Sequence, residues 1–307
     1  MSDNAEFPDT PFPQSPVVPS LLEGGTPIQF RCHKAIACFN ACCKNIDISL
    51  TPYDILRLKH RLGLTSTEFL TRYTMPYEME KNGIAGVKLR PVENGTACQF
   101  MTEEGCGVYT DRPTACRYYP VALLSMRRQN EYTEREAYAL VEEAHCLGHQ
   151  EPRTITIDAY RQEQGLPEYD DAGRGWRQLI LKKKSSGPTV GTPSKRSLQF
   201  FFMACYDLDR FRDFVASDAF ADVYALDEAL RTTVMNDEMQ LMEFAFRLIR
   251  QIMFNEVTIP LKVDALEKRQ ARKQERDAVM AEIVAKVGPV EGTPLEDERY
   301  TCSNPDS

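Results

Sequence analysis

The feature that most constrains the fold of this chain is the concentration of its cysteines in the first half of the sequence. Seven of the ten cysteines fall between Cys32 and Cys116, and an eighth, Cys146, lies shortly beyond. In a reducing compartment thiols stay reduced, and reduced cysteines that cluster in sequence are more often metal ligands or redox groups than disulfide partners. The clustering therefore predicts a metal-binding region whose folding depends on ligand bonds.

The clustered cysteines fall into three groups. They are Cys32-x5-Cys38-x3-Cys42-Cys43, Cys98-x7-Cys106-x9-Cys116 and, alone in the sequence HCLGH, Cys146. Thiolate is a soft and strong ligand for zinc and for iron–sulfur clusters. Eight thiolates suffice for two four-ligand sites or for one site with spare thiols. Because adjacent side chains on a helical turn point in different directions, Cys42 and Cys43 either sit in a tight turn around one cluster or serve two different sites.

The remaining cysteines and the histidines are separate cases. Cys205 lies in an apolar helical pattern, which predicts a core residue, and Cys302 lies in the C-terminal tail, where we expect no role. Imidazole also binds zinc and iron, so a ligand role stays open for the three histidines that lie near cysteines in sequence. These are His33, His145 and His149. His60 lies on the polar face of a predicted helix and is expected to be structural or solvated.

The residues around the second group carry a family resemblance. The segment ACQFMTEEGCGVYTDRPTACRYYP, the cysteine-rich start and the later Cys-Leu-Gly resemble the YkgJ-type cysteine-cluster family, which is described by a CxxCxxCC zinc- or iron-chelating domain. The resemblance covers about residues 30–165. The first group departs from the family pattern, because its spacings are five and three rather than two and two. The resemblance implies eight metal ligands, which are Cys32, Cys38, Cys42, Cys43, Cys98, Cys106, Cys116 and Cys146.

Two hypotheses about function remain open. The first is an iron–sulfur protein that serves redox or group-transfer chemistry, including modification of a protein substrate; some members of the family resemble flagellin lysine-N-methylases. The second is a non-enzymatic module in which zinc replaces a hydrophobic core and the helical half binds a protein partner. We favour iron, because adjacent cysteines and more than four thiolates are unusual in simple structural zinc sites. The sequence shows no Gly-rich motif after a strand that would support a Rossmann-type methyltransferase site.

Several residues near Cys116 are expected to support the site. Pro113 suits the first turn of a short helix that presents Cys116, with Asp111 as its N-cap. Arg117, in the same Arg112–Arg117 stretch, is expected either to offset the negative charge of the thiolates or to form a surface salt bridge. The neighbouring aromatic side chains are expected to shield the metal from water. They are Phe100, Tyr109, Tyr118 and Tyr119.

We predict an α+β, mostly helical protein, in which a cysteine-rich metal-binding domain with little strand precedes a helical C-terminal part. The predicted divisions are a disordered arm at 1–25, the cysteine-cluster domain at 26–165, a linker or mobile loop at 182–197, a helical region at 198–287 and a disordered tail at 288–307. Helices are predicted over 52–62, after the capping box Thr65–Glu68, and over 156–164, 197–215, 237–254 and 261–287. Strands are predicted at 86–92, 121–126 and 138–141, the last two as a hairpin.

Charge and hydropathy argue against other classes of function. The net charge of −8 and the pI near 5.3 are unlike those of a nucleic-acid-binding protein, which needs a basic surface to displace counterions from phosphates. The N-terminus is polar, proline-rich and acidic, unlike a secretory signal, and the apolar runs are far shorter than the roughly 20 residues of a membrane span. We therefore expect a cytoplasmic protein that binds neither nucleic acid nor membrane and acts on a protein partner or substrate.

Overall fold

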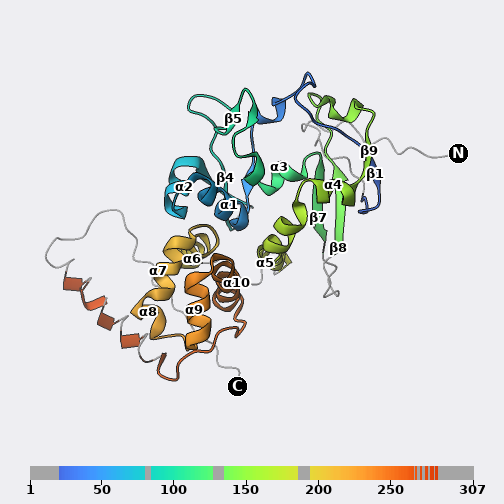
Figure 1. Ribbon diagram of the computed structural model, residues 1–307. Coiled ribbons are helices and arrows are strands. Elements are labelled where there is room, and N and C mark those ends of the chain that lie inside the picture. Colours follow the sequence, from blue (N-terminus) through green and yellow to red (C-terminus); the bar gives the residue numbers. More distant parts are fainter. Residues whose placement is uncertain are drawn as a thin grey trace, which may run out of the picture. The chain divides into compact units, whose positions relative to one another are not determined.

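The computed structural model describes residues 21–79, 84–126, 135–185 and 194–265, together with scattered positions between 267 and 282 (Figure 1). The backbone divides into two compact units. The first lies within Met1–Ser217 and Leu226–Ile259, and the second within Asp218–Ala225 and Pro260–Ser307. All cysteines of the three groups belong to the first unit, as do the helices from residue 195 to residue 216.

The fold is α+β and mostly helical, as predicted, and its strands form small antiparallel sheets. A three-stranded sheet has the order β2-β4-β3, and three two-stranded sheets pair β1 with β9, β5 with β6 and β7 with β8. The strands are β1 (Pro27–Gln29), β2 (Ser49–Leu50), β3 (Thr74–Glu78), β4 (Ala85–Leu89), β5 (Met101–Thr102), β6 (Gly105–Cys106), β7 (Val121–Met126), β8 (Arg135–Leu140) and β9 (Thr154–Thr156).

The first two helices begin at the caps that the sequence predicts. Helix α1 (Pro52–Leu62) starts after Thr51, which forms a capping box with Asp54, and helix α2 (Ser66–Tyr73) starts after Thr65, which forms one with Glu68. Helix α1 ends at Gly63, whose φ of 65° is a left-handed conformation that glycine adopts without a steric penalty. Both predicted helices are confirmed.

The predicted hairpin is also confirmed. Strand β7 spans the predicted residues, and β8 pairs with it from Val121↔Leu140 to Met126↔Arg135. The predicted strand at 86–92 is β4, which pairs with β3. Strand β3 is not in the prediction because it contains Pro76, and proline is typical only of edge strands; β3 is indeed at the edge of its sheet.

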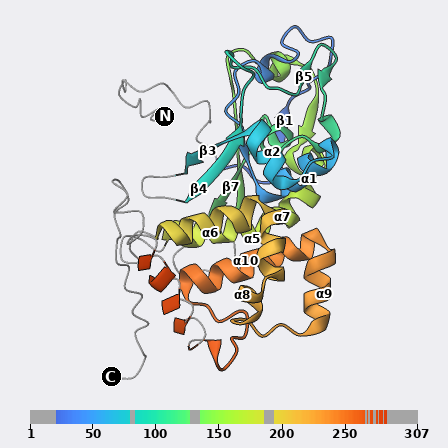
Figure 2. The ribbon, with the colours of Figure 1, turned by 90° about the vertical axis from the view of Figure 1, so that its left-hand side faces the viewer.

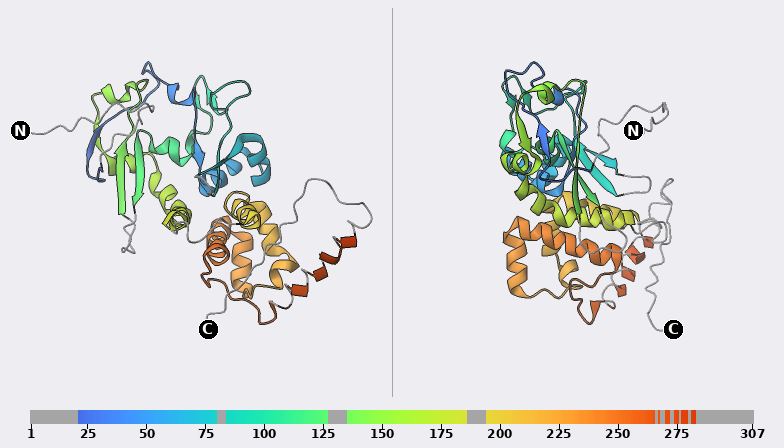
Figure 3. Two further views of the ribbon diagram at one scale, coloured as in Figure 1. Left: turned by 180° about the vertical axis from the view of Figure 1, so that it is seen from behind. Right: turned by 90° about the vertical axis from the view of Figure 1, so that its right-hand side faces the viewer.

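A buried cluster fills the space between the β7–β8 hairpin, β1 and helix α4 (Ile157–Glu163) (Figure 3). Helix α4 begins after the Thr156 cap and is followed by Gly165, with φ 66°, so the prediction for 156–164 holds. Helix α5 (Leu166–Ser185) is not in the prediction, and the first residues of the predicted linker 182–197 belong to it. The cluster comprises Ile28, Phe30, Tyr118, Val121, Tyr138, Ile157, Tyr160 and Leu166.

The helices after residue 194 bury a continuous apolar stripe. They are α6 (Lys195–Tyr206), α7 (Leu208–Ala216), α9 (Glu228–Asn236) and α10 (Glu238–Phe254), and α6 lies beside α10 (Figure 2). Leu241 and Leu248 of α10 and Cys205 of α6 have no exposed surface, so Cys205 is a core residue as predicted. The single helix predicted at 197–215 is two helices, because the backbone leaves the helical region at Asp207, with φ −113° and ψ 68°.

The two ends of the chain lie partly or wholly outside the described residues. Of the arm predicted at 1–25, only residues 21–25 are described, and Leu22 exchanges two backbone hydrogen bonds with Tyr138, at 2.7 and 2.9 Å. This pairing ties the last residues of the predicted arm to β8. Residues 186–193 of the predicted linker, the tail 288–307 and Cys302 lie outside the described residues. In the second unit, helix α8 (Asp218–Ala221) precedes a bridge between Tyr224 and Leu261, and the described positions from 267 to 282 are helical.

Candidate metal centre

Two hydrogen bonds bring the start of the first cysteine group to the segment that contains Cys146. The backbone N–H of Arg31 donates to the carbonyl of Gly148 at 3.1 Å, which places Cys32 beside residues 146–148. The backbone N–H of Leu147 donates to Cys38 Sγ at 3.3 Å. The structure therefore gathers three cysteines that lie up to 114 positions apart in sequence (146 − 32 = 114).

The thiols of this region interact with one another electrostatically. Partial desolvation and the neighbouring thiols of Cys42, Cys38 and Cys146 together raise the pKa of Cys32 to about 11. A thiolate that forms near other thiolates is disfavoured unless a cation offsets the charge. Cys32 and Cys42 are exposed, whereas Cys38 and Cys146 are half-buried.

The adjacent cysteines lie on a single turn of 3-10 helix, Ala41–Cys43, that follows Asn40 in a left-handed conformation with φ 65°. Their sulfur atoms are 3.9 Å apart and share a hydrogen bond. This bond lowers the pKa of Cys42 to about 7, while the same bond and burial raise the pKa of Cys43.

The second cysteine group is positioned by the β5–β6 hairpin. Cys106 pairs with Met101 across the hairpin, and Gly105, with φ 119°, makes the tight turn possible. The backbone N–H of Phe100 donates to Cys98 Sγ at 3.4 Å, and the N–H of Val108 donates to Cys106. In both turns a backbone N–H two residues later points at the sulfur. Such hydrogen bonds stabilise a thiolate and are typical of thiolates that hold zinc or iron–sulfur clusters.

Cys116 lies on the short helix α3 (Thr114–Tyr118), whose start is fixed by a distant carboxylate. Asp54 of α1 is fully buried, and its Oδ1 accepts hydrogen bonds from the backbone N–H and the hydroxyl of Thr114, at 2.8 and 2.7 Å. The prediction that Asp111 caps this helix is wrong, and Pro113 occupies the cap position instead of the first turn. Asp54 was missed because a contact across 60 residues leaves no local pattern.

Arg117 takes neither of its two expected roles. Its guanidinium donates to the carbonyls of Arg112, Gln164 and Thr110, and it lies over the Tyr169 ring with 4.0 Å to the centroid. The residue is 6% exposed. Arg117 is therefore a buried residue whose hydrogen bonds connect the loop before α3 to the start of α5. The partners described for it include no thiol.

The aromatic side chains divide into different roles. Tyr119 has a buried hydroxyl beside Cys146 and Glu143, and burial and these two groups raise its pKa. Tyr118 donates to Asp170 at 2.8 Å and belongs to the core, and Phe100 is 8% exposed. Tyr109 is 59% exposed and lies under the Arg112 guanidinium. Of these four aromatic residues, Tyr119 and Phe100 lie beside cysteines. The hydroxyl of Tyr119 and the side chain of Phe100 are both buried.

The histidines near the cysteines have other partners. His33 Nε2 lies 3.2 Å from a Glu151 carboxylate oxygen, and His145 Nε2 lies 3.6 Å from Glu143. His149 Nε2 lies 3.2 Å from the carbonyl of Val141. These contacts provide each ring with a polar partner that is not a metal ion. His60, expected to be structural or solvated, forms a short contact with Glu238.

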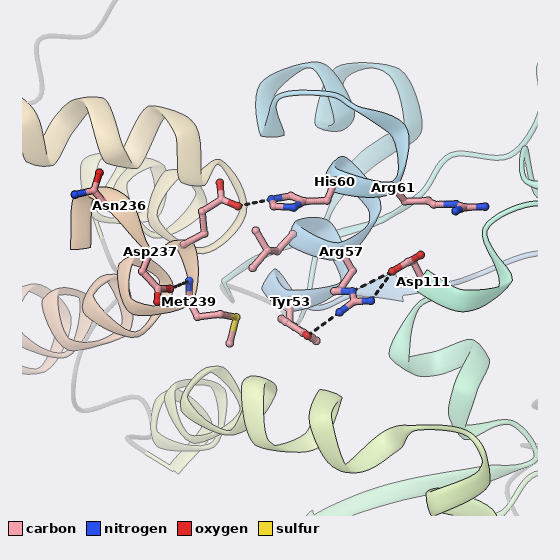
Figure 4. Close-up of a pocket in the computed structure, with 10 residues that line it drawn as sticks. Tyr53, Arg57, His60, Arg61, Asp111, Asn236, Asp237 and Met239 are labelled. Carbon is pink, nitrogen blue, oxygen red and sulfur yellow. Dashed lines mark hydrogen bonds and ion pairs between the residues drawn. The ribbon is translucent and has the colours of Figure 1, made fainter. Parts of the chain in front are cut away.

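A cavity of about 560 Å³ lies apart from the cysteines, between α1, Asp111 and the start of α10 (Figure 4). Its polar side chains pair with one another: Arg57 donates to Asp111 at 2.7 Å, and Figure 4 shows His60 directed at α10. The buried Lys59, also on α1, donates to Asp209 at 3.1 Å and to Glu238 at 2.6 Å. The cavity is lined by residues of α1 and the start of α10 together with Asp111, and none of its lining residues is a cysteine.

The donor chemistry of the cysteine region fits a soft metal. Within the part of the chain that the structure describes, no group of three or more His, Cys, Asp and Glu side chains already stands in position to hold an ion. Hydrogen bonds bring Cys38 to the segment of Cys146 and join Cys43 to Cys98. Backbone N–H groups donate to the sulfurs of Cys38, Cys98 and Cys106. Sulfur atoms that accept such hydrogen bonds suit zinc or an iron–sulfur cluster.

Comparison with known families identifies this region. Residues 31–147 match the model of the family CxxCxxCC, described as a putative zinc- or iron-chelating domain. This part of the chain is therefore similar to a zinc- or iron-chelating domain, and the match begins one residue before Cys32 and ends one residue after Cys146. Searches of curated proteins and of solved structures give no significant match. No helix among the described residues is both long enough and apolar enough to cross a bilayer.

Proposed function

We propose that this protein is an iron–sulfur protein whose cysteine domain serves redox or group-transfer chemistry on a protein substrate. The observation that supports the proposal is that hydrogen bonds bring Cys32, Cys38 and Cys146 together and join Cys43 to Cys98, while backbone N–H groups donate to sulfur. The eight cysteines clustered in sequence are twice the number that one tetrahedral ion can take. Iron–sulfur clusters are held by four cysteine thiolates each, and hydrogen bonds to the sulfurs adjust their reduction potentials.

The residues of the site would have different roles. The eight cysteines would hold the metal, and a bound iron–sulfur cluster would supply one-electron transfer. The N–H groups of Phe100, Val108 and Leu147 reduce the negative charge on Cys98, Cys106 and Cys38 by donating to their sulfurs. Exposed Cys32 and Cys42 give the site a solvent-accessible side, from which a protein substrate or an electron donor could approach.

A zinc-stabilised interaction module is the second candidate. The loops that carry the cysteines bury few apolar side chains among the described residues, chiefly Ile36, Phe100 and Val108. Metal ligation replaces a hydrophobic core in small domains of this kind. In this alternative the helices after residue 194 would bind a protein partner and no catalysis would occur.

We also propose a cellular location and a class of partner for this protein. Free thiols persist in a reducing compartment, which supports a cytoplasmic protein. The net charge of −8 favours a protein substrate or partner over nucleic acid.

Purification without oxygen or chelators tests the proposal. We expect iron and acid-labile sulfide in comparable amounts, broad visible absorption, and bleaching with a paramagnetic signal on reduction by dithionite. Stoichiometric zinc without sulfide would support the interaction module and overturn the iron–sulfur proposal. Absence of both metals would overturn metal binding itself.

A further inference from the structure

We propose that the cavity between α1, Asp111 and the start of α10 binds an extended segment of the protein substrate, in which an acidic and a basic side chain flank an apolar one. The inference rests on the proposed function for the class of occupant, and it adds the place and the chemistry of docking. All residues that line the cavity belong to the first compact unit. Its volume of about 560 Å³ lies within the range of about 300–1,000 Å³ that is typical of ligand sites.

The two walls of the cavity come from separate parts of the chain. Four residues of α1 line one wall at spacings of three and four positions, which places them on one face of the helix. They are Tyr53, Leu56, Arg57 and His60. The opposite wall is the junction 236–239, where α9 ends and α10 begins. The backbone at Asp237 is extended there, with φ −121° and ψ 115°, so the second wall is not a continuous helix.

The middle of the cavity is apolar. Tyr53 and Leu56 are each 5% exposed, and Met239 is half-buried. Figure 4 shows Met239 and Tyr53 between Asp237 on one side and Arg57 on the other. An apolar side chain placed against these residues would remove both its own surface and theirs from water, which is favourable.

Most charged groups around the cavity neutralise one another. Arg57 donates to Asp111 at 2.7 Å. Glu238 accepts from Lys59 at 2.6 Å and also contacts His60. Because these groups already have partners, they hold the walls in place and offer little to a charged ligand.

Two charges of opposite sign remain without an ion-pair partner among the described residues. Arg61 is exposed and lines the cavity, and Asp111, which attracts it electrostatically, is already held by Arg57. Asp237 uses only Oδ1, which accepts from the backbone N–H groups of Met239 and Gln240 at 2.8 and 3.1 Å. Its Oδ2 accepts no hydrogen bond from the part of the chain that the structure describes. The cavity therefore complements a ligand that carries one charge of each sign.

The separation of these two charges favours a peptide over a free amino acid. Figure 4 shows Arg61 and Asp237 at opposite ends of the residues that line the cavity. A free amino acid carries both charges on one carbon atom and has no apolar group between them. In an extended peptide, side chains at alternate positions point to the same side at intervals of about 6.6 Å. Three such side chains present an acidic, an apolar and a basic group in a row.

The cavity also adjoins the cysteine region. Asp111, which lines it, is the last residue of the 3-10 turn Tyr109–Asp111 and lies midway in sequence between Cys106 and Cys116. Its pairing with Arg57 joins this turn to α1. A segment bound in the cavity would therefore lie against the loop that connects two of the proposed metal ligands.

Binding of synthetic peptides to the full-length protein as purified tests the inference. The test peptides are fluorescein-labelled and amidated, with glutamate, leucine and lysine at alternate positions, in both orders, and serine elsewhere. Fluorescence anisotropy at low ionic strength measures the dissociation constant. We expect saturable binding of at least one order, weakened when glutamine replaces glutamate or lysine and when serine replaces leucine. Absence of saturable binding for both orders would overturn the inference.

Two substitutions assign the ends of the peptide. Arg61→Gln should weaken binding about threefold, as for one exposed ion pair, and should leave the peptide without glutamate unaffected. Asp237→Asn retains the helix cap, because asparagine caps as well as aspartate, and should weaken only peptides that contain lysine. The matched controls are Arg72→Gln and Asp227→Asn, an exposed arginine and an exposed helix cap that do not line the cavity. Equal effects of the cavity variants and their controls would overturn the assignment.

Photo-cross-linking of the wild type provides a measurement without variants. A benzophenone side chain replaces the leucine of the peptide, and the attached positions are mapped by mass spectrometry. We expect attachment at Met239 or Leu56, which line the cavity. Attachment only elsewhere would overturn the inference, as would a dimer, detected by sedimentation, that excludes the peptide.

The metal content of the same preparations separates this inference from the proposed function. Iron and sulfide in a protein that binds no peptide would overturn the docking site and leave the proposed chemistry in place. Peptide binding by a protein that contains zinc, or no metal, would support the docking site and overturn the iron–sulfur proposal.

Discussion

The carboxylate of Asp54 accepts two hydrogen bonds from Thr114, one from its backbone N–H at 2.8 Å and one from its hydroxyl at 2.7 Å. Its other oxygen accepts from the Thr51 N–H at 2.8 Å. One buried side chain therefore caps its own helix, α1, and also fixes the start of α3, two residues before Cys116. This relationship connects the helical scaffold directly to a proposed metal ligand.

Asp54→Ala should lower both stability and metal retention. Removal leaves buried N–H groups of Thr51 and Thr114 without an acceptor, and we expect the free energy of unfolding to fall by about 3 kcal/mol. Urea unfolding followed by circular dichroism measures this change, and metal analysis should show less metal per chain, because Cys116 is no longer held in place. Asp47→Asn, at an exposed Lys88 pair, is the matched control and should alter neither quantity. Unchanged metal content in Asp54→Ala would show that α3 is positioned without this contact.

Lys59→Met should weaken the joint between α1, α7 and α10, which is the pair of ion pairs that Lys59 forms with Asp209 and Glu238. Lys59 is 4% exposed and donates to Asp209 and Glu238, which are partly exposed. Removal of a buried cation leaves both carboxylates less compensated, and we expect a loss of about 2 kcal/mol, less than for a fully buried pair. Arg72→Met, which removes an exposed pair with Glu68, should change the urea midpoint little. Equal midpoints for the two variants would contradict this account of the joint.

The same joint should make the protein acid-labile. Burial raises the pKa of Glu238, but hydrogen bonds from Lys59, Arg212 and His60 outweigh it and hold the pKa below its ordinary value of 4.5. A carboxylate with a lowered pKa in the folded state contributes stability above its ordinary pKa, and the contribution is lost as pH falls through the lowered value. Urea midpoints should therefore drop below about pH 4.5. Lys59→Met should show a shallower drop over the same range, and identical slopes would argue against the assignment.

Arg117→Lys should destabilise the fold without altering the proposed metal centre directly. Arg117 donates to three backbone carbonyls and to Tyr169, and a lysine cannot reproduce this fixed fork. We expect a loss of about 2 kcal/mol from unsatisfied carbonyls. The visible spectrum of the metal-loaded variant should match that of the wild type. A shifted spectrum with unchanged stability would instead indicate that Arg117 acts on the thiolates.

Tyr119→Phe should affect the metal centre more than the fold. The buried hydroxyl contacts only side chains of the cysteine region, Cys146 and Glu143, so its removal should change the free energy of unfolding by only about 1 kcal/mol. In the metal-loaded protein a hydroxyl that donates to Cys146 would withdraw charge from the thiolate, and its loss should lower the reduction potential. A redox titration measures this shift, with the exposed Tyr109→Phe as the control. Identical potentials would show that the hydroxyl does not donate to the thiolate.

Local signals in the sequence predicted the elements that local interactions fix. Thr51 and Thr65 begin helices because their side chains satisfy the first N–H groups, and Gly63 ends a helix because it accepts a positive φ. The apolar runs at 121–126 and 138–141, separated by a polar stretch, predicted the hairpin. Clustered thiols likewise predicted the metal-chelating region.

Contacts between distant segments could not be predicted from such local signals. The Asp54–Thr114 bonds join residues 60 positions apart, and Leu147 reaches Cys38 across 109 positions. Neither contact alters a local pattern, so the cap of α3 and the neighbourhood of Cys38 could not be predicted. Arg117 was misjudged for the same reason, because its acceptors are backbone carbonyls that any residue provides.

The central claim is that the thiolates of residues 31–147 bind metal, and a thiol titration before and after metal removal tests it most directly. In native, anaerobically purified protein the eight cysteines from Cys32 to Cys146 should react slowly with a thiol reagent. Removal of the metal should release eight further reactive thiols, together with the bound iron or zinc, while buried Cys205 reacts only on unfolding. Immediate reaction of all eight thiols in native protein, with no metal released, would contradict the account.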